Sequence, residues 1–442
     1  MATSATSIAR PLSRRAGQRG VGMVETMVGI LIGMIVIVVV FNILSVAEGY
    51  KRATVGTSDA QITGLLSQFV AGRDASNGGA GITMSGTDMV NCTKNEAGAL
   101  VSGLPLTSLD AAIRPIPVLV TDGGAPGTSD SFISYSAGAA HVMWPVDFTD
   151  NSAAGAVIVV QSPNGFTVPP PTPAKPYWVV VMANDGTLRC KLVRVTAAVP
   201  DPTLPLTGKV TLTQDAALKT AIAYNVAIPP PLLLNLGPQD LATRIQYDVD
   251  PANAVLRSTD LLVVPPNPLV TVPIAQNIVL MKVQYGIGSN VLANGAHDGI
   301  VTCWTEAIDG SACSNGVNNN FSDNAVRGFN LTQFNSILAV RIGVVVRNDE
   351  PDLRLLTDPS NPELIAESAG IISGTRPPVY LFNCSANTNA ACQGRVQVPM
   401  GLGANPRTGL CAPNVICDYW RYRAYETIVP IRNAIYSATM IP

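Results

Sequence analysis

Charged residues are scarce in this chain of 442 residues: Asp, Glu, Lys and Arg make up 13% of it, and the formal net charge is −2. No acidic residue lies in 1–20, which holds four arginines, so the remainder is more acidic than the total indicates. Such a chain lacks the clustered basic surface with which proteins hold a phosphate backbone. We therefore expect no nucleic acid among its partners.

Aromatic residues are also few, at 5%, whereas the chain has 38 glycines and 34 prolines. This composition is typical of many short strands and turns and argues against a helical bundle. Only two histidines occur, His141 and His297, and no GxSxG, HExxH, Walker A or GxGxxG motif is present. The sequence therefore predicts no catalytic site, no metal centre and no cofactor. The Asn-rich stretch CSNGVNNNFSDN (313–324) leaves calcium open, but it lacks the ligand order of a known calcium loop.

No CxxC pair and no Cys/His cluster is present, so zinc is not expected. The eight cysteines all follow the long apolar segment, and an even set so placed suggests disulfides in an oxidising compartment. Six of them are close neighbours, which we predict to pair locally, leaving one long-range pair; free buried thiols are the alternative. The predicted pairs are Cys303 with Cys313, Cys384 with Cys392, Cys411 with Cys417, and Cys92 with Cys190.

One segment carries no charge over residues 26–47, between Glu25 and Glu48. As a helix it would be about 33 Å long, close to the ~30 Å hydrocarbon core of a bilayer. The arginines before it would stay in the cytoplasm, so the bulk of the chain would be exported. A cleaved signal peptide is the alternative, but Ser45-Val46-Ala47 gives only a weak cleavage pattern.

The residues before this segment carry a more specific signal, Gly20 followed by Val21-Gly22-Met23-Val24-Glu25. This arrangement resembles the class III leader of type IV prepilins. The resemblance implies that a prepilin peptidase cuts after Gly20, that Val21 is then N-methylated, and that Glu25 is the fifth mature residue. Val21 stands where the family usually has Phe, and Gly22 where it often has Thr or Ser.

Glu25 is a carboxylate at the apolar end of a membrane segment, where a charge is costly unless it is paired. In the family that the leader resembles, this glutamate meets the positive amino terminus of a neighbouring subunit in the filament core. The alternative is a glutamate that reaches the interface from a plain anchor. Gly29 and Gly33 form a GxxxG step, which permits close helix approach.

The helix should continue beyond the membrane, since no proline occurs between Leu12 and Leu104. An amphipathic stripe is predicted at helical spacing, and a glycine cluster at 78–81 should end the helix. In pilins, the outer half of this helix packs on a β-sheet. The stripe consists of Ile62, Leu65, Leu66, Phe69 and Val70.

From about residue 76 the pattern changes to Val- and Ile-rich runs bounded by Pro, Gly, Asn and Asp, which predict strands. Proline stretches at 163–176, 228–238 and 263–268 are interpreted as linkers or strand-edge loops. The strand candidates are Ala156–Gln161, Tyr177–Ala183, Lys191–Ala197, Lys209–Thr213, Arg244–Val249, Asn277–Tyr285 and Leu338–Arg347.

Several stretches of the body resemble the PilW family of minor pilins. They are GRDASNGGAGI after the helix, MKVQYGIGSNVLANGAHDGIVTCW, ILAVRIGVVVRN and, near the end, YRAYETIVPIRN. The resemblance covers roughly 21–80, 275–347 and the last twenty residues. Residues of about 90–275 match nothing in that family and are interpreted as an enlargement or insertion.

Taken together, these features predict an α+β, pilin-like chain in which a long amino-terminal helix packs on an antiparallel sheet of an enlarged β-rich body. The expected parts are a leader (1–20), a membrane and filament-core helix (21–47), its amphipathic continuation (48–76) and an exported body (77–442). The resemblance implies as partners the major pilin, other minor pilins, the peptidase and the inner-membrane assembly platform. The alternatives are a tip adhesin, a type II secretion pseudopilin and a single-pass anchored enzyme.

Overall fold

The structure is a computed structural model of the chain. The chain forms two compact units, Met1–Gly56 and Thr57–Pro442. The described residues are 22–81, 116–124, 128–138, 145–150, 157–163, 165–166, 175–182, 190–200, 208–215, 230–262, 270–288, 299–311, 313–314, 319–329, 331–349, 379–382, 396–398 and 422–431.

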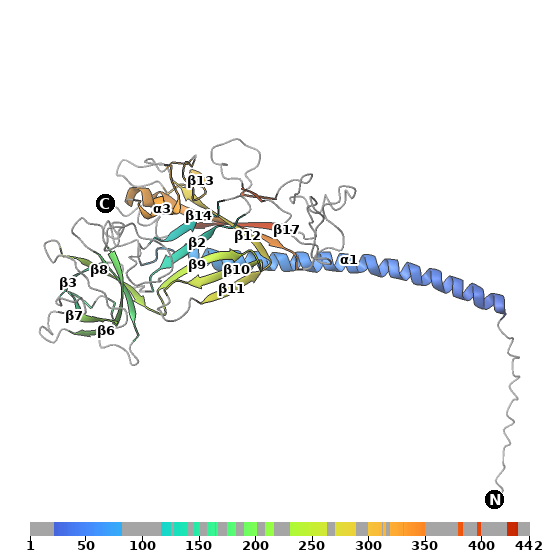
Figure 1. Ribbon diagram of the computed structural model, residues 1–442, viewed down its shortest axis with the longest axis horizontal. Coiled ribbons are helices and arrows are strands. Elements are labelled where there is room, and N and C mark those ends of the chain that lie inside the picture. The colour runs from blue at the N-terminus through green and yellow to red at the C-terminus, as the bar shows by residue number, and fades with distance from the viewer. Residues whose placement is uncertain are drawn as a thin grey trace, which may run out of the picture. The chain divides into compact units, whose positions relative to one another are not determined.

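The first element is the helix α1, Met23–Ser76, 54 residues long and coloured blue in Figure 1. The glycines that follow the helix in the sequence explain where it ends, since Gly79 and Gly81 have φ values of 80° and 69°. This left-handed backbone region is open to glycine at little steric cost, and it cannot continue a right-handed helix. The prediction that the glycine cluster ends the helix is confirmed.

Five antiparallel strands form the first sheet, in the order β1-β2-β9-β10-β11. They are β1 (Val118–Thr121), β2 (Ser131–Ser136), β9 (Thr243–Asp250), β10 (Val255–Asp260) and β11 (Thr271–Gln276). Pro273 is tolerated within β11 because β11 is the edge strand, where a missing N–H donor breaks no second ladder.

A closed six-stranded barrel lies between β2 and β9 in the chain. Its order is β3 (Val146–Asp150), β4 (Val157–Val160), β7 (Val210–Gln214), β6 (Cys190–Pro200), β5 (Tyr177–Met182) and β8 (Leu232–Pro238). The ring closes where Val146 and Asp147 of β3 pair with β8. One set of alternate residues, among them Phe148, Val179 and Val181, forms a tightly buried cluster, as the two-residue period of strands requires.

The second sheet has the order β13-β12-β14-β17, again antiparallel. Its strands are β12 (Ile278–Ile287), β13 (Cys303–Thr305), β14 (Ile337–Arg347) and β17 (Tyr422–Pro430). Two short helices, α3 (Asp323–Arg327) and α4 (Leu331–Asn335), precede β14. A small pair, β15 (Val379–Leu381) with β16 (Val396–Val398), completes the described elements.

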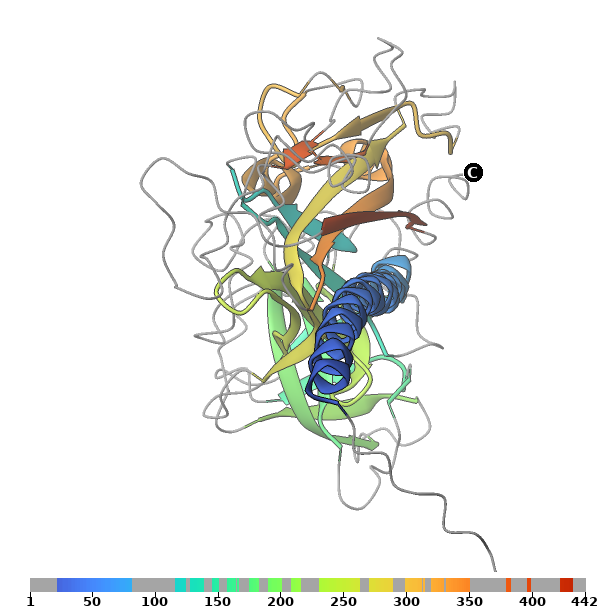
Figure 2. The ribbon, with the colours of Figure 1, turned by 90° about the vertical axis from the view of Figure 1, so that its right-hand side faces the viewer.

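The largest hydrophobic core joins the second half of α1 to both sheets. Ala71 and Ala75 of the helix pack with residues of β1, β2, β9, β12 and β14, and this half of the helix runs alongside the strands in Figures 1 and 2. A second cluster lies on the outer side of the barrel, where Trp178 and Leu234 meet Tyr135 and Leu262. Both faces of β5 and β8 are therefore buried, one within the barrel and the other against the second cluster.

All seven strand candidates from the sequence overlap an observed strand. The interpretation of 228–238 as a linker or strand-edge loop is wrong for Leu232–Pro238, which is β8 and pairs with strands on both sides. Its apolar run fills both faces, and Gly237 accommodates a bulge with a φ of 101°. The proline stretch at 263–268 lies outside the described residues.

Candidate membrane and assembly helix

Gly22 directly precedes the helix α1, and its carbonyl accepts the N–H groups of Glu25 at 2.9 Å and Thr26 at 3.1 Å. The hydroxyl of Thr26 donates back to the Met23 carbonyl at 3.0 Å. Glu25 is exposed in this first turn, where the helix dipole favours a negative charge. Among the described residues, no ion pair includes Glu25. Its carboxylate is therefore placed at the start of the helix and open to a partner.

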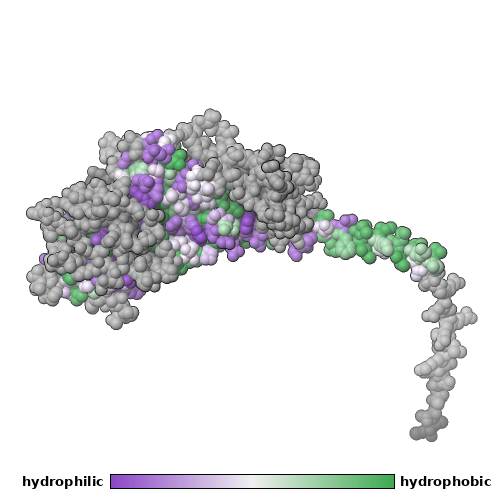
Figure 3. Space-filling view, viewed as in Figure 1, coloured by the Kyte–Doolittle hydropathy of each residue, from purple (hydrophilic) through white to green (hydrophobic). Residues whose placement is uncertain are grey.

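The segment Met23–Glu48 is an apolar span of 26 residues with a mean hydropathy of 3.0 and no burial within the chain. It is the green stretch of α1 in Figure 3, and Phe41, at 68% exposed, is typical of its side chains. A helix of this length and composition can cross a bilayer. By the same criteria it fits either a membrane anchor or a signal sequence.

Two glycines of this span are not required by the chain's own packing. A Cβ added at Gly29 or Gly33 would meet no atom within 4 Å. The processing residues Gly20 and Val21 lie outside the described residues, so their predicted roles stay predictions.

Small side chains form the face of α1 that packs on the body. The buried row is Ala60, Gly64, Ser67, Ala71 and Ala75, spaced four, three, four and four residues apart. The ring of Tyr425 lies directly against the backbone of Gly64, and a Cβ at Gly72 would lie 3.4 Å from Val429. Both neighbours come from β17, so the row lets the helix backbone approach the second sheet closely.

The predicted amphipathic stripe faces the other way. Ile62, Leu65, Leu66 and Phe69 are 63%, 53%, 47% and 68% exposed, and only Val70 packs against the core. The outer half of the helix therefore packs on the sheets, but through the small-residue row and not through this stripe. The physical reason is distance, since bulky side chains would hold the helix away from strands that the small residues let it touch.

The carboxyl-terminal end of α1 is tied to the first sheet through Asp74. The hydroxyl of Tyr247 donates to the Asp74 carboxylate at 2.6 Å, and that of Ser134 donates to the Asp74 carbonyl at 2.5 Å. Arg73 donates to the other carboxylate oxygen at 2.8 Å. Burial, together with this hydrogen bond and charge, raises the pKa of Tyr247 above its ordinary value. The tyrosine is thus a neutral donor that fixes the helix end.

A buried ion pair joins the loop before β2 to the second sheet. The Nζ of Lys282 lies 2.7 Å from Asp130 and 3.4 Å from Asp122. Asp130 also accepts the N–H groups of Gly123 at 2.9 Å and Val283 at 2.8 Å. Burial raises the pKa of Asp130 to about 6, although Lys282 opposes the shift. These groups saturate the carboxylate, so the pair is structural.

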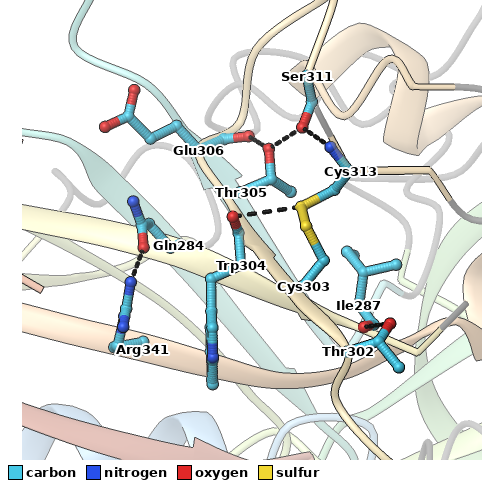
Figure 4. Close-up of a disulfide and its surroundings, with 10 residues drawn as sticks. All are labelled: Gln284, Ile287, Thr302, Cys303, Trp304, Thr305, Glu306, Ser311, Cys313 and Arg341. Atoms are coloured by element: carbon cyan, nitrogen blue, oxygen red, sulfur yellow. Dashed lines mark hydrogen bonds between the residues drawn. A yellow bond between two sulfur atoms is a disulfide. The ribbon is translucent and has the colours of Figure 1, made fainter. Parts of the chain in front are cut away.

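A disulfide joins Cys303 of β13 to Cys313, with the Cα atoms 5.8 Å apart (Figure 4). This is one of the pairs that the spacing predicted. The Cys313 N–H donates to the Ser311 hydroxyl at 3.0 Å, and that hydroxyl lies 2.5 Å from the hydroxyl of Thr305. The disulfide therefore secures the loop that follows the edge strand β13.

Next to the disulfide, Arg341 of β14 lies between two aromatic rings. Its guanidinium is 4.8 Å from the centre of the Trp304 ring and 4.2 Å from that of Phe382. It also donates to the side chain of Gln284, as Figure 4 shows. The cation–π contact with Trp304 holds β13 against β14, and the hydrogen bond joins β14 to β12.

All but one of the remaining candidate residues lie outside the described residues. Cys190 begins β6, and its predicted partner Cys92 lies outside the described residues, as do both histidines. The other predicted disulfide cysteines, Cys384, Cys392, Cys411 and Cys417, lie outside them too.

In the described part of the chain, no three His, Cys, Asp or Glu side chains form a group that could hold a metal. Within the Asn-rich stretch, the amide oxygen of Asn320 accepts both the N–H and the hydroxyl of Ser322. That oxygen therefore serves a local turn.

Two features of the site were missed from the sequence. The small-residue row had a readable signal, since Ala, Gly and Ser recur at helical spacing from 60 to 75. The Lys282–Asp130 pair had none, because it joins residues far apart in the chain. No protein-family model, curated protein or solved structure matches the chain.

Proposed function

We propose that the chain is a minor pilin of a type IV pilus, a structural subunit that supports filament assembly and the adhesion and twitching that depend on it. The observation that carries the proposal is the start of α1. An apolar span of 26 residues has one carboxylate, Glu25, in its first turn, and Gly20 precedes it in the sequence. A long helix followed by a β-rich, mostly antiparallel body agrees with the same reading.

In this function, Glu25 forms an ion pair with the positive amino terminus of a neighbouring subunit once the helices leave the bilayer. An ion pair in an apolar core adds more to register than to stability, because desolvation offsets much of the attraction. The open first turn of α1 suits such a partner. Gly29 and Gly33 would let a neighbouring helix approach this span.

The body suits a subunit present in few copies. It holds two sheets and a closed barrel, a bulk that is hard to repeat along a thin fibre. We place it at or near the filament tip, in a complex with other minor pilins that primes assembly on the inner-membrane platform. Before assembly the body lies in the periplasm; afterwards it lies on the cell surface.

Mass spectrometry of the mature amino terminus tests the assignment. We expect a chain that begins at N-methylated Val21, and a Gly20→Leu variant that keeps its leader. Gly22→Ala is the matched control and should still be processed. Normal-length mature protein from Gly20→Leu would refute the pilin assignment.

The docking role of Glu25 has its own test. Glu25→Ala should insert in the membrane and lose its leader normally, while its amount in sheared pili falls about tenfold. Glu48→Ala, at the other end of the same span, is the control and should assemble as the unaltered chain does. Equal incorporation of the two variants would remove Glu25 from the mechanism.

A second candidate is a tip adhesin, favoured by the barrel that lies between two paired strands of the first sheet. A domain placed there can change without disturbing the helix or the second sheet. Binding of the purified chain to immobilised glycans or to host-cell surfaces would support this function. Normal adhesion by piliated cells that carry a variant chain without residues 139–241 would argue against the adhesin function.

A further inference from the structure

The contact between the barrel and the first sheet contains two polar atoms that are buried among apolar side chains. They are the hydroxyl of Tyr135, on β2, and the indole N–H of Trp178, on β5. The two residues are 1% and 0% exposed, and both belong to the second hydrophobic cluster. Within the described part of the chain, neither atom has a hydrogen-bond partner. Since buried polar groups in folded proteins are almost always hydrogen-bonded, this pair requires an acceptor.

The side chains around the pair do not supply that acceptor. The hydroxyls of Ser136 and Thr243, next along β2 and β9, lie 2.7 Å apart and are already hydrogen-bonded to each other. An indole N–H only donates, whereas a tyrosine hydroxyl both donates and accepts. The other buried members of the cluster are apolar and offer no strong acceptor; they are Val180, Met182, Leu192, Leu232, Leu234, Leu236, Ala242 and Leu262.

Arg244 gives the Tyr135 hydroxyl a charged neighbour. It lies directly opposite Tyr135 in the pairing of β2 with β9, so the two side chains are on the same face of the sheet. Arg244 is itself buried, at 4% exposed. Burial raises the pKa of Tyr135, and the charge of Arg244 opposes that rise. The hydroxyl is therefore neutral and close to a cation, in a place that favours an added oxygen atom.

We infer that a buried water molecule binds at this contact and accepts hydrogen bonds from the Tyr135 hydroxyl and the Trp178 indole N–H. Water has two acceptor lone pairs, and buried water usually makes about three hydrogen bonds to polar groups that the chain leaves unsatisfied. It carries no charge into the cluster, so it avoids the desolvation penalty that an anion would bring.

This water would join the first sheet to the barrel, since one donor belongs to β2 and the other to β5. A water-mediated bridge is nearly as favourable as a direct hydrogen bond, and it demands defined directions from both donors. The bridge would therefore help to fix how the barrel is seated on the sheet. The inference does not depend on the proposed function, because it concerns a contact within the body.

Nuclear magnetic resonance of the full chain in detergent tests the inference through its indole groups. The chain has four tryptophans, so a sample with isotope-labelled tryptophan gives four indole signals, and Trp178→Phe identifies that of Trp178. Should this variant not fold, replacing the other three tryptophans one at a time identifies the signal by elimination. We expect cross-relaxation between the Trp178 N–H and water, with the sign of a bound molecule. No such peak would overturn the inference.

Tyr135→Phe is the matched variant, because it keeps the ring and removes only the hydroxyl. The indole signal of Trp178 should shift, whereas that of Trp304, which lies on the second sheet, should not. The cross-relaxation peak should remain, since Phe leaves the space of the hydroxyl to water. Loss of the peak in this variant would show that it came from the hydroxyl proton, and the inference would fail.

Exchange of the salt separates water from an anion as the bound acceptor. The same spectra recorded with chloride replaced by sulfate should be unchanged at Trp178. A Trp178 signal that follows the chloride concentration would assign the site to an anion and overturn the water.

Discussion

Gly64 shows how one missing side chain decides how closely a helix lies on its sheet. The ring of Tyr425 occupies the space that a Cβ at Gly64 would need, and the contacted atoms lie near the base of the ring. The ring can therefore move aside only if β17 or α1 moves as well.

We predict that Gly64→Val lowers the free energy of unfolding of the body by roughly 1–3 kcal/mol, as overpacking of a close contact usually does. Urea unfolding of the full chain in detergent measures the change. Gly33→Ala is the control; it meets no neighbour in the chain and should leave the midpoint unchanged or slightly higher. Equal midpoints for Gly64→Val and the unaltered chain would contradict the close packing.

Asp130 gives the stability of the body a pH dependence. Burial holds the pKa of its carboxyl at about 6, above the ordinary 3.8, so between these values the folded state binds more protons than the unfolded state. Stability from this group is therefore greatest at low pH and falls as pH rises from about 4 to about 6, by roughly 1.4 kcal/mol per pKa unit.

Asp130→Asn should remove this slope, which unfolding measurements from pH 4 to pH 7 would show. Because Asn resembles the protonated carboxyl, the variant should keep at neutral pH the stability that the unaltered chain has near pH 4. Lys282 itself does not titrate in this window, since its pKa is raised above 10.5 by the facing carboxylates against the effect of burial. An unchanged slope would show that Asp130 is not the titrating group.

At the scale of elements, the disulfide and Arg341 together hold the short edge strand β13. The strand has three residues, too few for its ladder alone to fix it. Without the covalent link, the loop that follows should gain freedom, and Trp304 should leave Arg341 more often.

We predict that replacing both Cys303 and Cys313 by Ser lowers the stability of this region by about 3 kcal/mol, the loop-closure value for roughly ten residues. Limited proteolysis should then cut between residues 299 and 314. Ser311→Ala, which removes a hydrogen bond and keeps the disulfide, should give much slower cleavage. Protection equal to that of the unaltered chain would contradict the role assigned to the disulfide.

The strands that the sequence predicts and those that it misses differ in a physical way. Val- and Ile-rich runs such as Tyr177–Met182 can be predicted as strands, because a strand that is buried on both faces is a continuous apolar segment in the sequence. Polar strands such as β2 and β11 are stabilised mainly by pairing with neighbouring strands. The sequence of one strand does not identify its pairing partner, so such strands are hard to predict.

The site shows the same division. The start of α1, its apolar span and its end could be predicted, because they depend on local residues. The face of α1 that meets the body was not predicted, because hydrophobicity favoured Ile62 and Phe69, whereas the close approach of the backbone requires small residues such as Ala71 and Gly64. A pattern that ranks residues by hydrophobicity alone overlooks a contact made by the backbone.

At the scale of the whole molecule, the barrel is joined to the rest by two neighbouring strands. Ser136 of β2 pairs with Thr243 of β9, and their hydroxyls lie 2.7 Å apart. The chain therefore leaves and re-enters the first sheet at almost the same point.

We predict that a chain in which a short Gly-Ser linker replaces residues 139–241 still folds its two sheets and keeps the Cys303–Cys313 disulfide. Its stability should fall by a few kcal/mol, because Tyr135 and Leu262 lose the barrel side chains that cover them. Circular dichroism and disulfide mapping would check this outcome. Loss of the β signal or of the disulfide would show that the barrel is needed for the remainder to fold.

The same junction has a consequence for the order in which the parts of the chain fold. Bringing β2 and β9 together across an unstructured stretch of roughly 100 residues carries a length-dependent entropy of about 4 kcal/mol. A barrel that closes first brings its own ends, β3 and β8, side by side and leaves only short connections to span. The strands β2 and β9 can then pair late, because the finished barrel already holds them close together.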